Sequence, residues 1–209
     1  MKLTFERGRG NKIHILRDGE YIITTDLDFW ADRFHCDSCC VSEPDFEEIL
    51  MQINDRKAVS KAFDFLSRRD YSQKELEQKL LRNGQLTPES AEKAVEKMIS
   101  LGYVNDRTYA YTLAEHLFEI KKMSVASCRM EMRRRGISGD LAEEILGEFD
   151  VDNIQQIQSV VESKYRCKLH TEKGRRQTVA ALQRKGFSYA DIKTALNSFD
   201  EFELDDYEE

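Results

Sequence analysis

Apolar residues recur at helical spacing along most of this chain, and three stretches of the pattern end in the same way. In each stretch a glycine closes one helix, a short link containing a serine or threonine follows, and another helix begins. The three glycines are Gly84, Gly136 and Gly186, which lie 52 and 50 residues apart. Equivalent residues lie 12 positions before each glycine: Ser72, Ser124 and Gly174. A period of this length is typical of stacked supersecondary units, so the sequence predicts a tandem array.

Helix-capping residues divide the first unit into three helices. Ser72 and Glu75 form the pattern of a capping box, in which the Ser72 hydroxyl accepts from the Glu75 amide and the Glu75 carboxylate accepts from the Ser72 amide. Thr87 followed by Pro88 is a typical start of a further helix. A helix before the capping box is predicted at about residues 56–69 from its apolar spacing. Each unit is therefore expected to hold three helices.

The second and third units show the same signals. Asn105 with Asp106 is predicted to cap the first helix of the second unit, and Asp152 is predicted to open the third unit. Three residues are predicted to face inward from the second helix of the second unit: Cys128, Met130 and Met132.

The first 25 residues have the pattern of strands rather than helices. Asp18-Gly19 separates two short apolar runs, which is a strong signal for a two-residue hairpin. Residues 2–5 are expected to add a third strand. Residues 26–54 then predict two short helices, the second of them opened by Pro44.

The predicted fold is mainly α, with a small N-terminal β-hairpin or meander followed by three tandem three-helix repeats. The N-terminal β-hairpin with short helices is predicted at residues 1–55. The three repeats are predicted at 56–105, 106–151 and 152–199, and the acidic tail at 200–209.

Charge is distributed unevenly along the chain. The formal net charge is -7, but seven acidic residues and no basic ones fall in the last ten positions, so residues 1–199 carry 32 basic and 32 acidic groups. Within this neutral body, basic residues gather on the second helices of the later repeats and on the links beside them, which favours binding of a polyanion or an acidic protein surface. The candidate partner-binding or nucleic-acid-binding residues are Lys121, Lys122, Arg129, Arg133, Arg134, Arg135, Arg175, Arg176, Arg184 and Lys185. A solvated helix face is an equally good interpretation of these charges taken alone.

Sequence motifs of several other classes of protein are absent. No apolar run reaches the roughly 18 residues of a membrane span, and the N-terminus does not have the pattern of a signal peptide, so we expect a cytoplasmic protein without membrane contact. Phosphate-binding loops, dinucleotide-binding glycine motifs and paired zinc histidines are missing, and the four histidines are scattered. We therefore expect no enzyme activity, no catalytic residues and no cofactor.

The cysteines offer one candidate for metal binding. Cys36 and Cys39 have the spacing of a zinc-ligand pair, with Cys40 and His35 beside them. A structural zinc site needs four ligands, and no second pair follows, so reduced cysteines without metal are the expectation.

Three-helix units with tight turns also fit a helix-turn-helix protein that binds DNA. In the first two units the helix after the turn is rich in acidic residues, however, and these would be repelled by phosphates.

The motif Tyr71-Ser72-x-x-Glu75-Leu76, followed by Leu101-Gly102-Tyr103-Val104-Asn105-Asp106, resembles the RecX family of recombinase regulators. The resemblance covers about residues 56–199, and the N-terminal strands resemble an extension found on many members. It implies an elongated, curved array of three three-helix repeats. It also implies a non-catalytic protein that lodges in the groove of the RecA recombinase filament on single-stranded DNA and restrains ATP hydrolysis and strand exchange.

Two functions are therefore predicted as alternatives. The first is a RecA-filament modulator that contacts single-stranded DNA only weakly or indirectly and is expected to be a monomer. The second is a stand-alone helical regulator that binds duplex DNA by itself. The tail, residues 200–209, is expected to be a solvated end, or a segment that competes with DNA for the basic helices.

Overall fold

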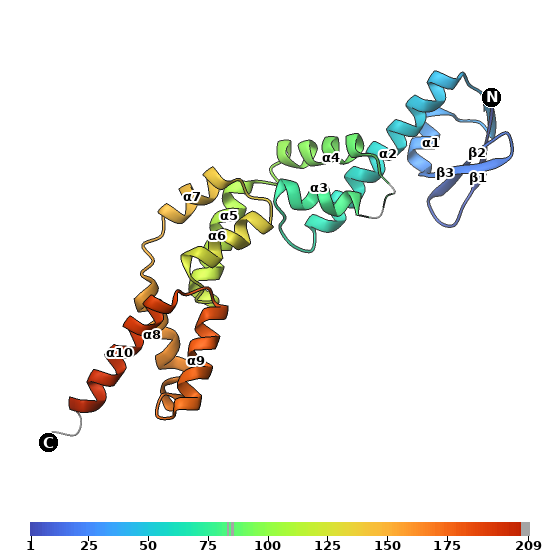
Figure 1. Cartoon of the computed structure of the whole chain (residues 1–209). Coiled ribbons are helices and arrows are strands. Elements are labelled where there is room, and N and C mark those ends of the chain that lie inside the picture. Colours follow the sequence, from blue (N-terminus) through green and yellow to red (C-terminus); the bar gives the residue numbers. More distant parts are fainter. Residues whose placement is uncertain (83, 85, 206–209) are drawn as a thin grey trace. The chain divides into compact units, whose positions relative to one another are not determined.

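The computed structural model describes residues 1–82, 84 and 86–205. Its contacts divide the chain into two compact units. The N-terminal unit comprises residues 1–69 and 76–103, and the C-terminal unit comprises residues 70–75 together with the chain from Val104 onward. The structure is mostly helical with a small antiparallel sheet at the N-terminus, which confirms the predicted fold class (Figure 1).

The sheet has the strand order β3-β2-β1-β4 and is antiparallel throughout. Its strands are β1 (Lys2–Arg7), β2 (Lys12–Arg17), β3 (Glu20–Asp26) and β4 (Ser38–Cys40). Asp18 and Gly19 both have positive φ, as the tight turn of the predicted β2–β3 hairpin requires. The third strand is likewise confirmed. The sequence did not predict β4, because three residues rich in cysteine are too short to show an alternating pattern.

Two helices cover one face of the sheet. Helix α1 (Leu27–Arg33) is capped by the Asp26 side chain, and α2 (Glu43–Leu66) begins with a capping box between Ser42 and Asp45. The core of this module is formed by alternating strand residues and by one face of each helix: Leu3, Phe5, Ile13, Ile15, Phe29, Phe46, Ile49 and Ile53.

Helix α2 corrects the predicted helix boundaries. The sequence predicts one helix opened by Pro44 and another over about residues 56–69, whereas α2 runs without a break through position 55. No glycine or proline lies between Asp45 and Leu66, so nothing in the backbone interrupts the helix. The predicted boundary at 55 therefore falls inside a continuous element. The first half of α2 packs on the sheet, and the second half packs on α4.

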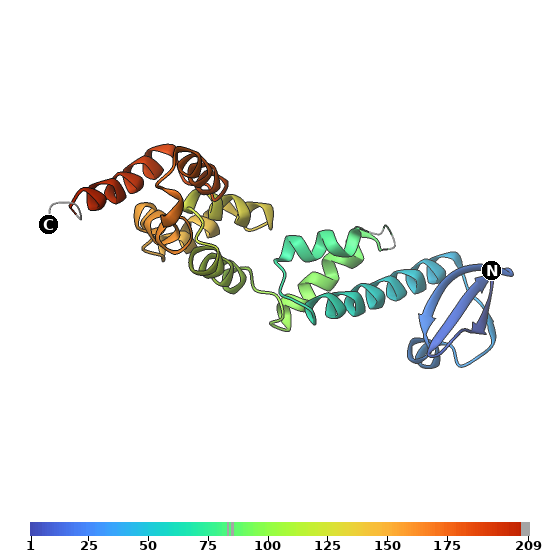
Figure 2. The same cartoon turned by 90° about the horizontal axis from the view of Figure 1, so that it is seen from below.

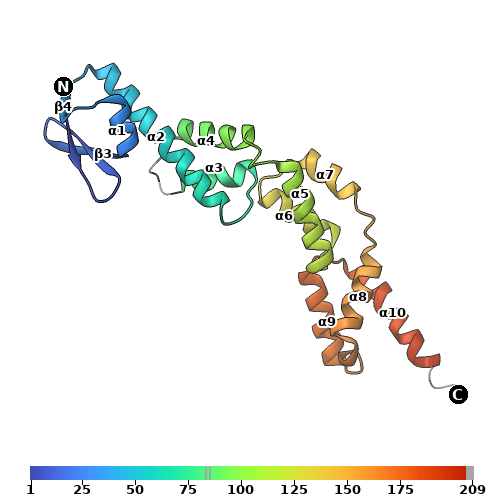
Figure 3. The ribbon, with the colours of Figure 1, turned by 180° about the vertical axis from the view of Figure 1, so that it is seen from behind.

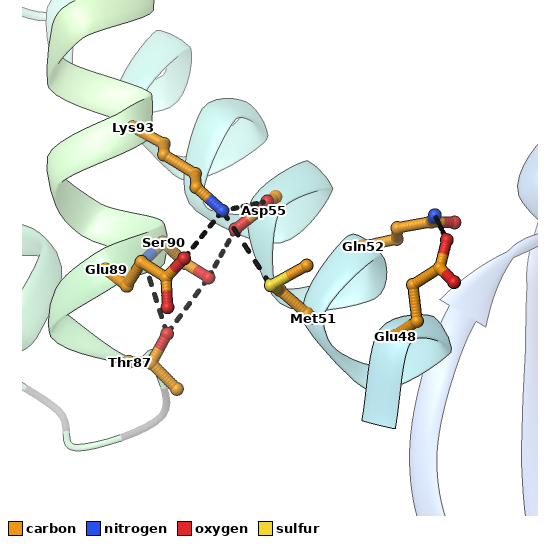
Figure 4. Close-up of polar contacts among 8 residues, drawn as sticks. All are labelled: Glu48, Met51, Gln52, Asp55, Thr87, Glu89, Ser90 and Lys93. Carbon is orange, nitrogen blue, oxygen red and sulfur yellow. Dashed lines mark hydrogen bonds and ion pairs between the residues drawn. The ribbon is translucent and has the colours of Figure 1, made fainter. Parts of the chain in front are cut away.

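The N-terminal unit also contains most of α3 (Gln73–Leu81) and all of α4 (Pro88–Ser100). A polar cluster joins α4 to α2 (Figure 4). Ser90 donates to Asp55 Oδ1 at 2.5 Å, and Lys93 pairs with Asp55 at 3.3 Å. The predicted cap is confirmed, since Thr87 Oγ1 accepts from the Ser90 amide at 3.2 Å.

The C-terminal unit contains two groups of helices with separate cores, which correspond to the second and third repeats (Figure 3). The second repeat comprises α5 (Asp106–Glu115), the π-helix η1 (His116–Ile120), α6 (Val125–Arg134) and α7 (Gly139–Gly147). The third comprises α8 (Asn153–Lys164), the short 3-10 helix η2 (Arg166–Lys168), α9 (Glu172–Arg184) and α10 (Tyr189–Asp205). The caps predicted at Asn105 and Asp152 are both present.

The structure overturns one detail predicted for these repeats and shows the place of Gly174. Met130 is 66% exposed, whereas Cys128 and Met132 are fully buried as predicted. Gly174 does not start its helix: Thr171 caps α9, and Gly174 lies within the first turn. A Cβ at Gly174 would lie 2.0 Å from the carbonyl oxygen of Lys168, so the glycine allows η2 to pack against α9.

The acidic tail is helical at its start, because α10 continues to Asp205. Residues 206–209 lie outside the described residues, so the predicted role of the tail stays a prediction.

Candidate partner-binding surface

The repeats contact one another through the serines that cap their second helices. Ser124 Oγ accepts from the Ser127 amide at 3.1 Å and donates to the carbonyl of Gly186 at 2.7 Å. Ser72 makes the equivalent contacts, because its hydroxyl accepts from the Glu75 amide and donates to the carbonyl of Arg135. Each serine thus binds the end of the second helix in the following repeat.

The repeat glycines are required at these contacts for two reasons. Gly136 and Gly186 have φ angles of +84° and +86°, which side-chain-bearing residues rarely adopt. A Cβ at Gly186 would also lie 1.8 Å from Ser127 Oγ, and one at Gly136 would lie 2.6 Å from Lys74 Cβ. At two of the three repeat glycines, Gly136 and Gly186, the start of a neighbouring helix therefore approaches the backbone.

The basic residue just before each of these glycines is held in the contact. Arg135 donates to Glu131 at 2.8 Å and to the hydroxyl of Tyr109 at 2.7 Å, and Lys185 donates to the carbonyl of Lys121. Burial lowers the pKa of Lys185, and nearby lysines lower it further. Arg135 and Lys185 are therefore fixed mainly by contacts within the protein.

Glu131 is the acidic partner of two of the predicted arginines. It accepts from Arg134 at 2.6 Å and from Arg135 at 2.8 Å. Hydrogen bonds from the Arg134 and Arg135 guanidinium groups lower the pKa of Glu131 to about 2, although partial burial opposes the change. This carboxylate therefore holds two positive charges at the end of α6.

Several other predicted residues also have partners within their own repeat. Arg129 forms a two-point ion pair with Glu143 of α7, with distances of 2.5 and 2.9 Å. Arg175 donates to the carbonyl of Leu169 at 3.0 Å. Two further pairs are exposed: Lys122 with Glu119 and Arg176 with Glu172. Exposed pairs of this kind contribute only about 0.3–0.5 kcal/mol, so an external anion can replace the acidic partner at little cost.

Three of the predicted residues remain open to a partner. One is Lys121, which is exposed and whose side chain makes no hydrogen bond or ion pair with the described residues. Arg133 on α6 and Arg184 on α9 are exposed, and neither side chain makes a hydrogen bond or ion pair with the described part of the chain. Arg184 also lines a groove of about 610 Å³ in the third repeat, together with Tyr165, Lys168 and Gln177. The Lys168 ammonium lies 5.4 Å from the centre of the Tyr165 ring.

Sequence reasoning missed Tyr165 and Lys168 as site residues. An aromatic ring beside cations is a common surface for binding single-stranded nucleic acids, because bases stack on the ring while cations contact phosphates. The sequence signal was weak, since Tyr165 follows α8 outside any periodic pattern and Lys168 belonged to a long run of basic residues.

Sequence reasoning also missed Arg82. This exposed residue lies two positions before Gly84, as Arg134 and Arg184 lie two positions before their own glycines. Aligning the repeats on their glycines therefore shows one exposed arginine at the same position of every repeat. Counting charges along the sequence did not show this pattern.

Comparisons with known proteins connect this arrangement to a family. The family model described as "RecX, first three-helix domain" matches residues 58–98. A protein of Trichlorobacter lovleyi named "Regulatory protein RecX" is 30% identical over 131 residues, which cover 60% of this chain and 84% of that protein. The chain belongs to the RecX family.

Other relatives agree with this assignment. A "Regulatory protein RecX" of Prosthecochloris aestuarii is 29% identical over 142 residues, which cover 68% of this chain and 93% of that protein. A solved structure titled "Crystal structure of regulatory protein RecX" aligns with a TM-score of 0.62 over 93% of this chain and 99% of that chain, at 16% identity. This structural likeness shows a shared fold.

Residues within and next to the two RecX motifs meet at one place in the C-terminal unit. Asp106 accepts from the Gln73 amide at 2.8 Å, and Tyr109 donates to Glu75 at 3.2 Å while accepting from Arg135. Burial raises the pKa of both Asp106 and Tyr109. The motif therefore builds the contact between residues 70–75 and the second repeat, and Arg135 of this contact directly follows Arg133 and Arg134 in the sequence.

The cysteines of this RecX-family chain do not assemble into a metal site among the described residues, where no group of three or more candidate ligands is found. Burial and the neighbouring Cys36 thiol raise the pKa of Cys39. Over residues 1–82, 84 and 86–205, none of the helices combines the length and apolar character needed to cross a bilayer.

Proposed function

We propose that this protein binds the RecA recombinase filament on single-stranded DNA and inhibits its ATPase and strand-exchange activities without catalysing a reaction. Membership of the RecX family carries this proposal, since its relatives are named as regulatory proteins. Physical support comes from the exposed arginines at equivalent repeat positions, which suit a partner that presents negative charge over a long surface. In this proposal the protein acts as a monomer in the cytoplasm.

The contact residues follow from the local geometry. Arg133 and Arg184 are proposed as the strongest contacts, because they carry no ion pair within the described residues that would have to break. Arg134 and Arg176 are exposed, and they are proposed to exchange their acidic partners, Glu131 and Glu172, for the filament or its DNA. Arg135 and Lys185 are proposed to position the surface instead, because the Arg135 side chain is held by Tyr109 and the Lys185 side chain by the carbonyl of Lys121.

The test is the ATPase rate of RecA on single-stranded DNA at low salt, with this protein in molar excess. We expect inhibition by the parent protein and a clear loss of inhibition for the double variant Arg133→Gln/Arg184→Gln. The matched control is Lys2→Gln/Lys97→Gln, which removes the same charge from exposed positions of β1 and α4. An unchanged ATPase rate with the parent protein would rule out the proposal, whereas equal loss in both double variants would rule out only the chosen contacts.

The alternative is a regulator that binds duplex DNA alone. In the second repeat, the helix that would read DNA is α7, and its acids Glu143, Glu144 and Glu148 are paired with arginines of the same repeat. These carboxylates would face phosphate repulsion, so RecA is the preferred partner. A filter-binding titration without recombinase separates the two functions, since the alternative requires tight duplex binding with a steep salt dependence.

A further inference from the structure

A second basic site lies in the N-terminal unit, where the sheet meets α2. A cleft of about 690 Å³ is lined by residues of the sheet and of α2. Figure 2 shows the ribbon of these elements in the N-terminal unit. The ends of β2 and β3 line one side through Lys12 and Thr25, and α2 lines the other through Arg56, Lys57 and Ser60. This volume falls within the range of small-molecule sites and exceeds the space that a single inorganic ion needs.

The charges in the cleft are unbalanced. Asp26 is the one acid among the described residues that line it, and both of its carboxylate oxygens are bound by Arg56, at 3.0 and 3.3 Å. Partial burial opposes ionisation of Asp26, but hydrogen bonds from Phe29 and Arg56 bring its pKa below the ordinary value. The Asp26 carboxylate therefore already binds Arg56 and caps α1. Lys12 and Lys57, the two lysines of the cleft, have no acidic partner among its lining residues.

Lys57 is the residue that most requires an anion. It is partly buried, and its ammonium group makes no hydrogen bond or ion pair with the described residues. Burial lowers its pKa, and nearby Lys61 lowers it further. A desolvated cation without a partner is costly, so an anion that enters the cleft gains a charge-assisted hydrogen bond and relieves this cost.

The Arg56 guanidinium is held in a fixed position at the edge of the cleft. It is anchored by Asp26 and lies 5.5 Å from the centre of the Phe29 ring. A group that is already ordered loses little conformational entropy when it binds a ligand. Ordered Arg56, partly buried Lys57 and exposed Lys12 together offer donors from two elements, which suits an anion with several acceptor oxygens.

We propose that this cleft binds the phosphate group of a nucleotide or of a single-stranded nucleic-acid backbone. The phosphate contacts Lys57 and Lys12, with the hydroxyls of Thr25 and Ser60 at hand as further donors, and the remaining volume accommodates the attached sugar or base. None of the repeat arginines of the proposed function lines this cleft.

The experiment titrates the isotopically labelled full-length protein with AMP and, separately, with a twelve-nucleotide oligo-dT, without recombinase. We expect the amide resonances of Thr25 and Ser60 to shift, and Lys57→Gln to weaken binding roughly tenfold. Lys2→Gln is the matched control, because it removes one charge from the same sheet outside the cleft, and we expect it to change affinity by less than about twofold. Lys12→Gln provides a second test at an exposed position, where loss of the charge does not disturb the core.

The two probes distinguish the source of the phosphate. Shifts with AMP and oligo-dT alike support a nucleotide phosphate site, whereas shifts with oligo-dT alone support a strand-binding site. If neither probe moves the cleft resonances, or if Lys57→Gln and Lys2→Gln weaken binding equally, the cleft proposal is wrong. Because no recombinase is present, this result is independent of RecA inhibition.

Discussion

At the residue scale, two residue types, serine and glycine, set the geometry of the contacts between repeats. A serine hydroxyl both accepts from its own helix start and donates to the next repeat, so one group satisfies two backbone positions that are otherwise unpaired at helix ends. A glycine supplies the positive φ and leaves room for that serine. Next to these glycines, the side chains of Arg135 and Lys185 are held by hydrogen bonds within the protein, whereas those of Arg133 and Arg184 are exposed to solvent.

Replacing Gly186 by alanine should destabilise the protein by roughly 3 kcal/mol, since the positive φ costs about 1–2 kcal/mol and the clash with Ser127 adds to it. Gly84→Ala is the matched control: its φ is +62°, but no described atom lies within 4 Å of the added Cβ. Only the backbone cost, about 1–2 kcal/mol, is expected there. Urea unfolding followed by circular dichroism measures both values, and equal losses would show that close packing at Gly186 contributes nothing.

Glu131 should make stability depend on acid pH. Its pKa is lowered from 4.5 to about 2 in the folded protein, so its contribution is fully present above pH 4.5 and is lost as the pH falls toward 2. The contribution is roughly 1–2 kcal/mol. Glu131→Gln should flatten the fall in unfolding free energy between these pH values. A variant with the same pH slope as the parent would contradict the assigned role of the two arginines.

At the element scale, sequence patterns located the helices well where caps and glycines mark their ends. The sequence patterns gave wrong helix or strand boundaries where such capping residues and glycines were absent. Helix α2 continued past the predicted boundary because no residue interrupts it, and β4 was too short to show a pattern. Gly174 lies at the same repeat position as Ser72 and Ser124 but does not cap its helix, because Thr171, three residues earlier, is the N-cap of α9. Among site residues, Tyr165 required the structure because only the fold brings it to α9.

The contact between the second and third repeats offers a test at this scale. Ser124→Ala removes both the cap of α6 and the hydrogen bond to Gly186, and the serine is buried, so a loss of about 2 kcal/mol is expected. Ser138→Ala is the matched control, since this exposed serine only caps α7. About 1 kcal/mol is expected for the control. If the two variants lose the same stability, the bond from Ser124 to Gly186 is not a significant link between repeats.

At the scale of the whole molecule, the position of charge along the chain has more consequence than its total. The formal net charge of -7 arises from the seven acids of residues 200–209, while the repeats present exposed arginines at regular intervals. The proposed filament binding therefore depends on local potential, which a net charge does not report. The cleft proposed to bind phosphate is a further local group of basic residues, in the N-terminal unit.

The acidic segment 200–209 should weaken binding of the free protein to DNA by competing for its basic helices. Changing its seven acids to the corresponding amides preserves the length of the chain and avoids removing the end of α10. Affinity for a fluorescent oligo-dT should then rise at low salt, and the gain should shrink at high salt because screening shortens the reach of the segment to about 3 Å at 1 M. An unchanged affinity at low salt would show that the segment is only a solvated end. A gain that persists at high salt would point to a direct contact instead of long-range competition, because contacts between adjacent groups are screened far less than those at a distance.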